Sequence, residues 1–364
     1  MSAEDLPDPT RVEGAPHPRE TERLRGQARA EADFRDAFNT GRLHHGWMLT
    51  GPRGVGKATL AWRIARFLLS DPGGMFAPES LDTDPDSALA HRIRAGAEPG
   101  VFVLKRGANA TETGLSQDIR VDEVRRAKSF LHLSAAEGGR RVVIVDAADE
   151  MNTQAANALL KLLEEPPERV TFLLVTHQPA RLLPTIRSRC RELRLATLGP
   201  ADMAQALEAA GVMLEDEDAA GLTALAGGSV GEAVRLVNLE GMEAYARLVA
   251  LFATLPRLDR AQAVALAERL AGKQNETRLD LTLGLLDLFL ARLARAGLQG
   301  PPVPEAAPGE AEVMARLAPD GAAALKWATL AQTLGARARH GRAVNLDPAA
   351  LVMDMVLEMT AAAA

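Results

Sequence analysis

A glycine-rich segment at residues 51–58 has the residue types that bind nucleotide phosphates. It reads Gly-Pro-Arg-Gly-Val-Gly-Lys-Ala and matches the pattern G-x-x-x-x-G-K-[ST] at every position except the last. It lies between a short apolar run and an amphipathic stretch, where a strand and a helix are expected. In such a loop, backbone N–H groups and the amino end of the helix converge on phosphate oxygens. We therefore expect the phosphates to be bound by Gly51, Gly54, Gly56 and Lys57.

The other groups that ATP hydrolysis requires are incomplete. Ala58 stands where a hydroxyl normally binds Mg²⁺, and Thr59, the next hydroxyl, points about 100° away on a helix. The apolar run at 141–146 ends in Asp146, which is suited to hold Mg²⁺ through water. Ala147 follows, where a carboxylate would orient the attacking water. We keep Thr59 and Asp146 as nucleotide-binding candidates but expect very slow hydrolysis.

Two more acids follow this strand. Asp149 and Glu150 come three and four residues after Asp146. We favour the interpretation that both are surface charges. The alternative is that they are poor substitutes for the missing base.

The composition is that of a globular protein with two or three domains. The chain has 364 residues, of which 47% are hydrophobic and 25% charged, and its net charge is -6. Contact with nucleic acid should therefore be local or shared with partners. The single cysteine, Cys190, excludes an internal disulfide and a cysteine-cluster zinc site. No apolar run is long enough to span a membrane, and the polar amino-terminal stretch lacks the apolar region of a secretion signal. We expect a cytoplasmic protein without a bound metal.

Apolar runs and helical periodicity predict an α/β domain followed by helices only. Apolar strands alternate with amphipathic helices, which is typical of a parallel sheet covered on both faces, and residues 70–100 look like a loop. The expected strands are 47–50, 101–104, 141–146 and 170–176, and the expected helices are 21–40, 58–69, 119–133 and 153–163. The expected divisions are a disordered tail at 1–20, the α/β domain at 21–198, a small helical domain at 199–240 and a larger helical domain at 241–364.

Several longer strings are more specific than the phosphate loop alone. Residues 43–47 read Leu-His-His-Gly-Trp and lead into the loop, and residues 157–167 read Asn-Ala-Leu-Leu-Lys-Leu-Leu-Glu-Glu-Pro-Pro. Residues 179–190 end in Ser-Arg-Cys. Through these strings the chain, from about residue 19 to residue 239, resembles the clamp-loader subunits of bacterial DNA polymerase III, which belong to the AAA+ superfamily.

The resemblance implies a fold and two site residues. The fold is an α/β, AAA+ P-loop parallel-sheet domain, followed by a small helical lid domain and an all-α C-terminal collar domain. In that family the arginine of the Ser-Arg-Cys string is an arginine finger, which reaches the ATP of a neighbouring subunit. Here that residue is Arg189, and Thr176 falls at the sensor-1 position. Without the surrounding string, Arg189 would be one exposed arginine among several.

The resemblance also implies a function and partners. The function is loading of the sliding clamp onto primed DNA during DNA replication, as part of a DNA-directed DNA polymerase (nucleotidyltransferase) holoenzyme. The implied partners are gamma/tau and delta clamp-loader subunits. The sliding clamp is contacted indirectly, and primed DNA is held within the complex.

Three departures set this chain apart from the catalytic members of the family. Ala58 and Ala147 lack the groups described above, and Gly231 stands at the sensor-2 position, where catalytic members carry arginine. These losses favour a largely ATPase-silent stator with weak or vestigial ATP binding. Residues 70–100 contain no cysteine, so we do not expect the zinc module of many relatives. The alternatives are an ATP-hydrolysing gamma/tau-type subunit and an unrelated P-loop enzyme such as a kinase.

Basic residues on one predicted helix are candidates for contact with the DNA backbone. By the resemblance, the helix at 119–133 lines the chamber that follows the DNA, and such cations bind phosphates. An equally good interpretation is a solvated face on which these cations are balanced by Asp122 and Glu123. The candidates are Arg120, Arg125, Arg126 and Lys128.

A leucine stripe marks one helix of the last predicted domain. Its members recur at alternating steps of four and three, which places them on one helix face. Such a stripe is most often core, and the alternative is that part of it faces a partner subunit. The leucines are Leu279, Leu283, Leu286, Leu290 and Leu293.

Overall fold

The computed structural model describes residues 8–71, 77–109, 114–133, 139–213 and 216–364 of the chain. The chain divides into two compact units. We call Met1–Met213 together with Gly228–Val234 the α/β unit, and Leu214–Gly227 together with Arg235–Ala364 the helical unit. The predicted small domain at 199–240 is therefore shared between the two units, and the division into three domains stays a prediction.

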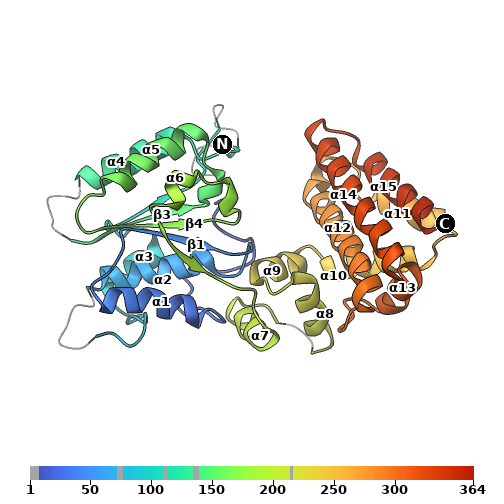
Figure 1. Cartoon of the computed structure of the whole chain (residues 1–364), viewed down its shortest axis with the longest axis horizontal. Helices are drawn as coiled ribbons and strands as arrows, with labels where there is room; N and C mark the ends of the chain where they lie inside the picture. The colour runs from blue at the N-terminus through green and yellow to red at the C-terminus, as the bar shows by residue number, and fades with distance from the viewer. Residues whose placement is uncertain (1–7, 72–76, 110–113, 134–138, 214–215) are drawn as a thin grey trace. The chain divides into compact units, whose positions relative to one another are not determined.

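A five-stranded sheet forms the centre of the α/β unit (Figure 1). Its order is β2-β3-β4-β1-β5 and every neighbouring pair is parallel, which confirms the predicted α/β class. The sequence pattern does not predict β5, because this edge strand buries only Leu193 and has no apolar run. The strands are β1 (Gly46–Thr50), β2 (Val101–Leu104), β3 (Arg141–Asp146), β4 (Val170–Val175) and β5 (Arg191–Arg194).

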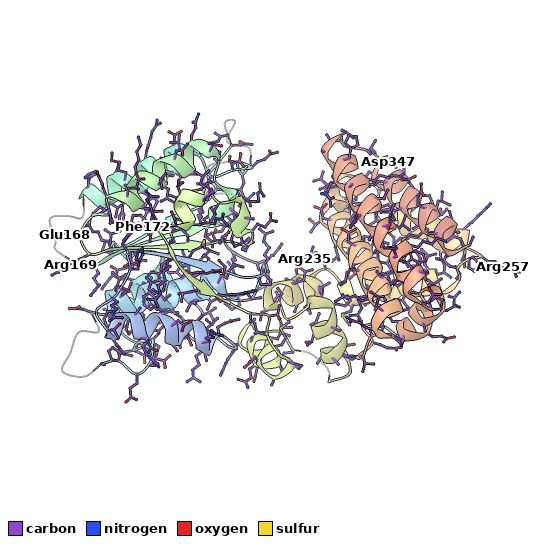
Figure 2. The ribbon with its side chains drawn as sticks, viewed as in Figure 1. Glu168, Arg169, Phe172, Arg235, Arg257 and Asp347 are labelled. Carbon is purple, nitrogen blue, oxygen red and sulfur yellow. The ribbon has the colours of Figure 1, made fainter. Side chains whose placement is uncertain are left out.

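Helices cover both faces of this sheet, with α4 and α5 on one face and α1, α2 and α3 on the other (Figure 1). Val143 and Val145 of β3 and Phe172 of β4 (Figure 2) belong to the core under α4 and α5. The helices are α1 (Ala28–Asn39), α2 (Lys57–Leu69), α3 (Ala88–Ala95), α4 (Val121–Leu133), α5 (Thr153–Glu164), α6 (Pro184–Arg187), α7 (Pro200–Ala209) and the shared α9 (Val230–Asn238), with 3-10 helices η3 (Ala148–Glu150) and η4 (Pro179–Arg181).

Two expectations on the α1–α3 side need correction. α1 begins at Ala28 and not at residue 21, because Gly26 has a φ of +71°, a left-handed conformation that interrupts a helix. Residues 70–100 are more than a loop, since they contain α3. The side chain of Ser87 caps the amino end of α3, and Gly96, with a φ of +70°, ends it.

Residues 8–20, for which we expected no fixed structure, make specific contacts within the α/β unit. The ring of His17 is buried and meets the ring of Trp62 edge-on, with 6.1 Å between centroids. The carboxylate of Asp8 accepts a hydrogen bond from the Thr10 hydroxyl (2.7 Å) and pairs with the ammonium of Lys105 (2.7 Å). His17 and Lys105 hold the pKa of Asp8 well below its usual range. Residues 1–7 of the predicted tail lie outside the described residues.

The described part of the helical unit contains helices and no strand. The predicted leucine stripe lies on α12 and its members are buried, which confirms its interpretation as core. Asp347, labelled in Figure 2, caps α15 by accepting a hydrogen bond from the N–H of Ala350 (2.9 Å). The helices of the helical unit are α8 (Asp216–Ala226), α10 (Gly241–Ala253), α11 (Arg260–Glu268), α12 (Glu276–Gln299), α13 (Glu310–Leu317), α14 (Gly321–Ala343) and α15 (Pro348–Ala363), with the 3-10 helix η5 (Lys273–Asn275). Within the described ranges, no helix of the chain is both long enough and apolar enough to cross a bilayer.

Candidate functional site

The glycines of the phosphate loop are fixed by the surrounding chain as well as by their own backbone. Gly51 has a φ of +140° and Gly54 a φ of +76°, values that L side chains rarely adopt. A Cβ atom on Gly51 would strike the carbonyl oxygen of Leu195, and one on Gly54 would strike the hydroxyl of Ser229. Gly56, at a φ of +98°, immediately precedes α2. The fold therefore requires glycine in this loop whether or not a nucleotide binds.

Lys57 is the first residue of α2, and its side chain is buried. Its ammonium donates hydrogen bonds to the backbone carbonyl oxygens of Gly51 (2.7 Å) and Pro52. Burial lowers the pKa of Lys57 to about 8, and the charges of Asp149 and Asp146 oppose this shift only in part. A buried cation that is held only by carbonyl oxygens would be stabilised by an anion, so this position suits a phosphate.

Asp146 is the last residue of β3. Burial and the charge of Glu150 raise the pKa of Asp146 to about 7, against the lowering effect of Lys57. Because metal ligands must be deprotonated, such a carboxyl group binds a divalent cation less readily than an ordinary aspartate. Thr59 is half-buried in the first turn of α2, next to Ala58, which has no hydroxyl.

The two acids after Asp146 both have partners. Asp149 is buried and does not lie on the surface as expected, because its carboxylate accepts a hydrogen bond from the backbone N–H of His177 (3.0 Å). The carboxylate of Glu150 pairs with Arg106 (2.9 Å) and with Arg53 (3.4 Å). Carboxylates with such partners are weaker bases toward water.

Thr176 directly follows β4 and is fully buried. Its backbone N–H donates to the carbonyl oxygen of Leu49 (3.0 Å), which places it beside the entry to the phosphate loop. Burial and the charge of Lys57 lower the pKa of the adjacent His177 to about 4, so this imidazole is neutral at pH 7. Lys57, Asp146 and Thr176 thus gather at the carboxyl ends of β1, β3 and β4, the edge at which open α/β sheets bind ligands.

The amino end of α9 packs directly on the phosphate loop. The N–H of Gly231 donates to the carbonyl oxygen of Gly54 (3.2 Å). A Cβ atom on Gly231 would lie 3.1 Å from the Cα of Gly54 and 3.6 Å from a methyl group of Val12. This contact leaves little room for a longer side chain, so the packing matches a glycine at this position.

Arg189 lies between α6 and β5 and is 37% exposed. Its guanidinium donates to the carbonyl oxygen of Thr185 (3.0 Å) and pairs with the carboxylate of Glu164 (3.0 Å), the last residue of α5. Both partners hold the side chain near the surface. The contact to Glu164 was not foreseen, although this glutamate is part of the string at 157–167.

Arg189 and the phosphate loop lie at opposite ends of the strands of the sheet. β5 runs parallel to β1, with Arg191 opposite Trp47 and Arg194 opposite Thr50. Arg189 therefore precedes the amino end of the strand pair, whereas the loop follows its carboxyl end. Since each strand residue advances about 3.3 Å, the length of β1 alone separates them by roughly 15 Å. Arg189 is thus remote from the phosphate loop of its own chain.

The four basic candidates on and before α4 differ in their surroundings. Arg125 and Arg126 are exposed and pair with acids one turn earlier on α4, at 2.6 Å and 3.1 Å. Lys128 is exposed, and Arg120 is half-buried just before the helix. Exposed ion pairs of this kind are weak. They leave the cations accessible to phosphates, so both interpretations of this helix stay open.

Some contacts that shape the site have no sequence signal. The side-chain amide of Gln27 accepts from the N–H of Ala196 (3.1 Å) and donates to the carbonyl oxygens of Ala196 (2.8 Å) and Val55 (3.2 Å). It thereby ties the phosphate loop to the chain that follows β5. A single glutamine before a helix belongs to no pattern. In the part of the chain that the structure describes, no group of three or more His, Cys, Asp or Glu side chains is placed to hold a metal ion.

The chain is similar to subunits of DNA polymerase III. The family model described as DNA polymerase III, delta subunit, matches residues 26–199. A DNA polymerase III subunit delta′ from Pseudomonas aeruginosa is 40% identical over 195 residues, which cover 53% of this chain and 55% of that protein. The subunit delta′ of Escherichia coli K12 is 36% identical over 155 residues, which cover 43% of each chain.

The chain spans about half the length of these curated relatives. A solved structure of a DNA polymerase III gamma subunit-related protein from Thermotoga maritima covers 91% of this chain and 100% of its own, at 19% identity and a TM-score of 0.41.

Proposed function

We propose that this chain, whose residues 26–199 belong to the DNA polymerase III delta-subunit family, is a delta′-type subunit of the clamp loader. It is a largely ATPase-silent stator within the polymerase holoenzyme. It supplies Arg189 to the ATP of a neighbouring subunit and helps to load the sliding clamp onto primed DNA.

The position of Arg189 carries this proposal. The residue is partly exposed. It lies at the amino ends of the strands, whereas the phosphate loop of its own chain lies at their carboxyl ends. A guanidinium in that position cannot serve the nucleotide of its own chain. It can stabilise charge on the phosphates of an ATP bound to a neighbouring chain that docks against this end of the sheet.

The condition of the chain's own nucleotide site supports the silent role. Ala58 and Ala147 supply no hydroxyl and no base, the pKa of Asp146 is raised to about 7, and Gly231 packs on the loop where catalytic relatives carry arginine. ATP binding, if retained, is weak or vestigial. Lys57 and the glycines are the residues that would hold its phosphates.

The remaining roles follow from the same proposal. Gamma/tau and delta subunits are the partners in a cytoplasmic complex, and the helical unit serves as the collar that joins them. Arg120, Arg125, Arg126 and Lys128 contact the backbone of primed DNA inside the complex.

The test is reconstitution of the full chain with its cognate gamma/tau and delta subunits, followed by measurement of DNA- and clamp-stimulated ATPase activity. We expect no turnover by the isolated chain. We expect Arg189→Ala to lower the turnover that depends on the adjacent site by about 10³-fold, the scale of a lost arginine finger. Size-exclusion chromatography checks that the variant still assembles.

Arg187→Ala is the matched control, because Arg187 is an exposed arginine only two residues away on α6. It should leave turnover unchanged. Turnover by the isolated chain, or equal effects of the two substitutions, would contradict the proposal in favour of an ATP-hydrolysing gamma/tau-type subunit or of a non-specific charge effect.

A further inference from the structure

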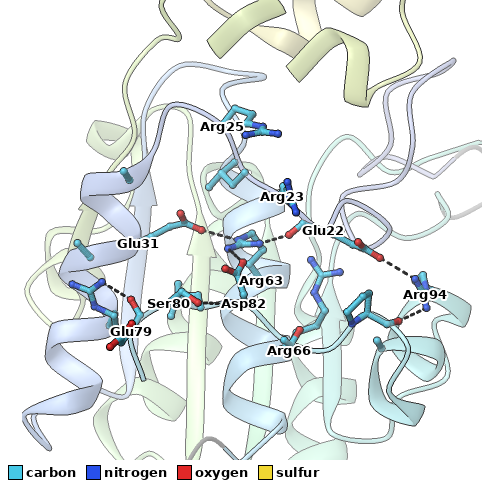
Figure 3. A pocket seen from close by; sticks show the side chains of 18 residues that line it. Glu22, Arg23, Arg25, Glu31, Arg63, Arg66, Glu79, Ser80, Asp82 and Arg94 are labelled. Atoms are coloured by element: carbon cyan, nitrogen blue, oxygen red, sulfur yellow. Dashed lines mark hydrogen bonds and ion pairs between the residues drawn. The ribbon is translucent and has the colours of Figure 1, made fainter. Parts of the chain in front are cut away.

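A pocket lies on the α/β unit, on the side of the sheet that carries α1, α2 and α3 (Figure 3). Its volume is about 570 Å³, within the range of small-molecule sites. Residues 22–25, 79–83 and 85 line it together with residues of these three helices. Six arginines line it: Arg23, Arg25, Arg35, Arg63, Arg66 and Arg94.

Only part of this positive charge is neutralised within the protein. The lining has six arginines and four acids, and Asp36 outside the lining pairs with one of the arginines, so one positive charge is in excess. Three of the arginines are paired with carboxylates, as the dashed lines of Figure 3 show for two of them. The pairs are Arg63 with Glu31 (2.7 Å) and Asp82 (3.0 Å), Arg94 with Glu22 (3.1 Å), and Arg35 with Asp36 (3.0 Å).

The other three arginines are Arg23, Arg25 and Arg66. Among the described residues, none of them has a carboxylate within ion-pair distance. Arg23 is exposed at the mouth of the pocket, and the Nε atom of Arg25 is buried without a hydrogen-bond partner in the described ranges. A buried donor that lacks a partner is costly, so an acceptor at this position would stabilise the protein.

Arg66 is the most buried of the three, with 5% of its surface exposed. Its guanidinium donates only to backbone carbonyl oxygens, those of Arg19 (3.2 Å) and Thr21 (2.5 Å). Burial and the charges of Arg63 and Arg94 lower the pKa of Arg66 to about 10, against the raising effect of Glu22. A bound anion beside Arg66 would therefore be stabilised.

We propose that this pocket binds the phosphate group of a small, nucleotide-sized molecule, with Arg23, Arg25 and Arg66 as its ligands. Guanidinium groups suit a phosphate because their N–H groups match its oxygens in pairs. A bound phosphate would supply negative charge that the lining lacks. The acids Glu22, Glu79 and Asp82 are partly exposed at the rim and would repel the continuous charge of a nucleic acid.

The buried arginine Arg66 lies away from the phosphate loop, although Leu24, at one end of the pocket, lies against Gly56 of the loop. Arg66 lies nine residues after Lys57 on α2, which at about 1.5 Å per residue places the two positions roughly 13 Å apart. α4, with the candidates for DNA contact, covers the other face of the sheet (Figure 1). This binding site is independent of the proposed arginine-finger function.

The test is isothermal titration calorimetry of the full chain without Mg²⁺, with inorganic pyrophosphate and AMP as probes and adenosine as the neutral control. Both phosphate-bearing probes should bind, and adenosine should not. In the double variant Arg23→Gln/Arg25→Gln, binding should weaken by about tenfold or more, as expected when charge-assisted hydrogen bonds are lost. Tighter binding of AMP than of pyrophosphate identifies a nucleotide, and the reverse identifies a free inorganic anion.

Two control variants keep the test specific. Arg29→Gln removes an exposed arginine of α1 that does not line the pocket, and Lys57→Ala disables the phosphate loop. Arg29→Gln should bind the probes like the wild type. Lys57→Ala should lose any binding at the phosphate loop and keep the binding that the double variant removes. The proposal is wrong if no probe binds at millimolar concentration, or if binding is lost in Lys57→Ala and kept in the double variant. Either result leaves Arg63 and Arg66 with the structural role of fastening residues 19–22 to α2.

Discussion

In the helical unit, a buried ion pair has a complete set of hydrogen-bond partners. In the α/β unit, several buried charged groups lack part of theirs. In the helical unit, the fully buried carboxylate of Glu310 accepts two hydrogen bonds from the guanidinium of Arg292 (2.6 and 2.9 Å). It also accepts from the hydroxyl of Tyr245 (2.5 Å) and the N–H of Ala306 (2.6 Å). Each carboxylate oxygen has two donors, so nothing further is needed to stabilise this charge.

In the α/β unit, the pKa of Lys57 is lowered to about 8 and that of Asp146 is raised to about 7 because neither charge is fully compensated. Within the described ranges, the buried side-chain polar atoms that lack a hydrogen-bond partner, such as Nδ1 of His177, all belong to this unit. Shifted pKa values of this kind gather at functional sites. The comparison indicates that one unit uses buried charge for stability and the other keeps it available for binding.

The largest stability effect should come from breaking the closed network. Glu310→Gln keeps the size of the side chain but leaves Arg292 buried without a counter-charge, which should cost about 3–5 kcal/mol. Hydrogen exchange of α12 and α13 in the full chain, measured by mass spectrometry, should show this loss. Arg342→Gln breaks the ion pair to Asp280, whose side chains are 37% and 53% exposed, and should cost at most about 1 kcal/mol. Equal costs would remove the distinction between a closed buried network and a surface pair.

A second substitution tests whether the phosphate loop is held by packing. Gly51→Ala should destabilise the α/β unit by about 3 kcal/mol, because the new methyl group meets a backbone carbonyl oxygen that cannot move aside. Gly41→Ala is the matched control, with a φ of +66° and no atom within 4 Å of the added carbon, and should cost about 1 kcal/mol. Urea unfolding monitored by tryptophan fluorescence compares the two. If Gly51→Ala is as mild as Gly41→Ala, the loop is not constrained as described.

The smallest of these effects should be a gain. Since the folded pKa of Asp146 is raised from 3.8 to about 7, the wild type loses stability as the pH rises through that interval. Asp146→Asn has no charge to bury, so it should be more stable than the wild type by about 2 kcal/mol at pH 8. This is less than the full pKa shift implies, because the structure around a buried charge relaxes. The gain should shrink to zero below pH 4, where both states of the wild type carry the proton. Urea unfolding at pH 4, 6 and 8 measures it, and a gain that does not depend on pH would contradict the assignment.

The sequence predicted four of the five strands and missed β5, one of the two edge strands. β1, β3 and β4 are continuous apolar runs because both faces of the sheet are covered. β5 buries only Leu193, and its partner strand, not its composition, makes it a strand. The sequence also failed to predict the contacts of residues 8–20, because no apolar pattern signals the burial of His17 against Trp62.

By itself, the sequence determined the phosphate loop, the missing hydroxyl and base, four of the five strands, and the strings that link it to one family. Those features are local, since each depends on residue types within one short segment. Only the tertiary structure decided that Arg189 and the loop lie at opposite ends of the strands, that Asp149 is buried, and that six arginines from separate segments line one pocket. These facts depend on which segments become neighbours, and parallel strands joined by long crossovers bring together residues that no sequence spacing connects.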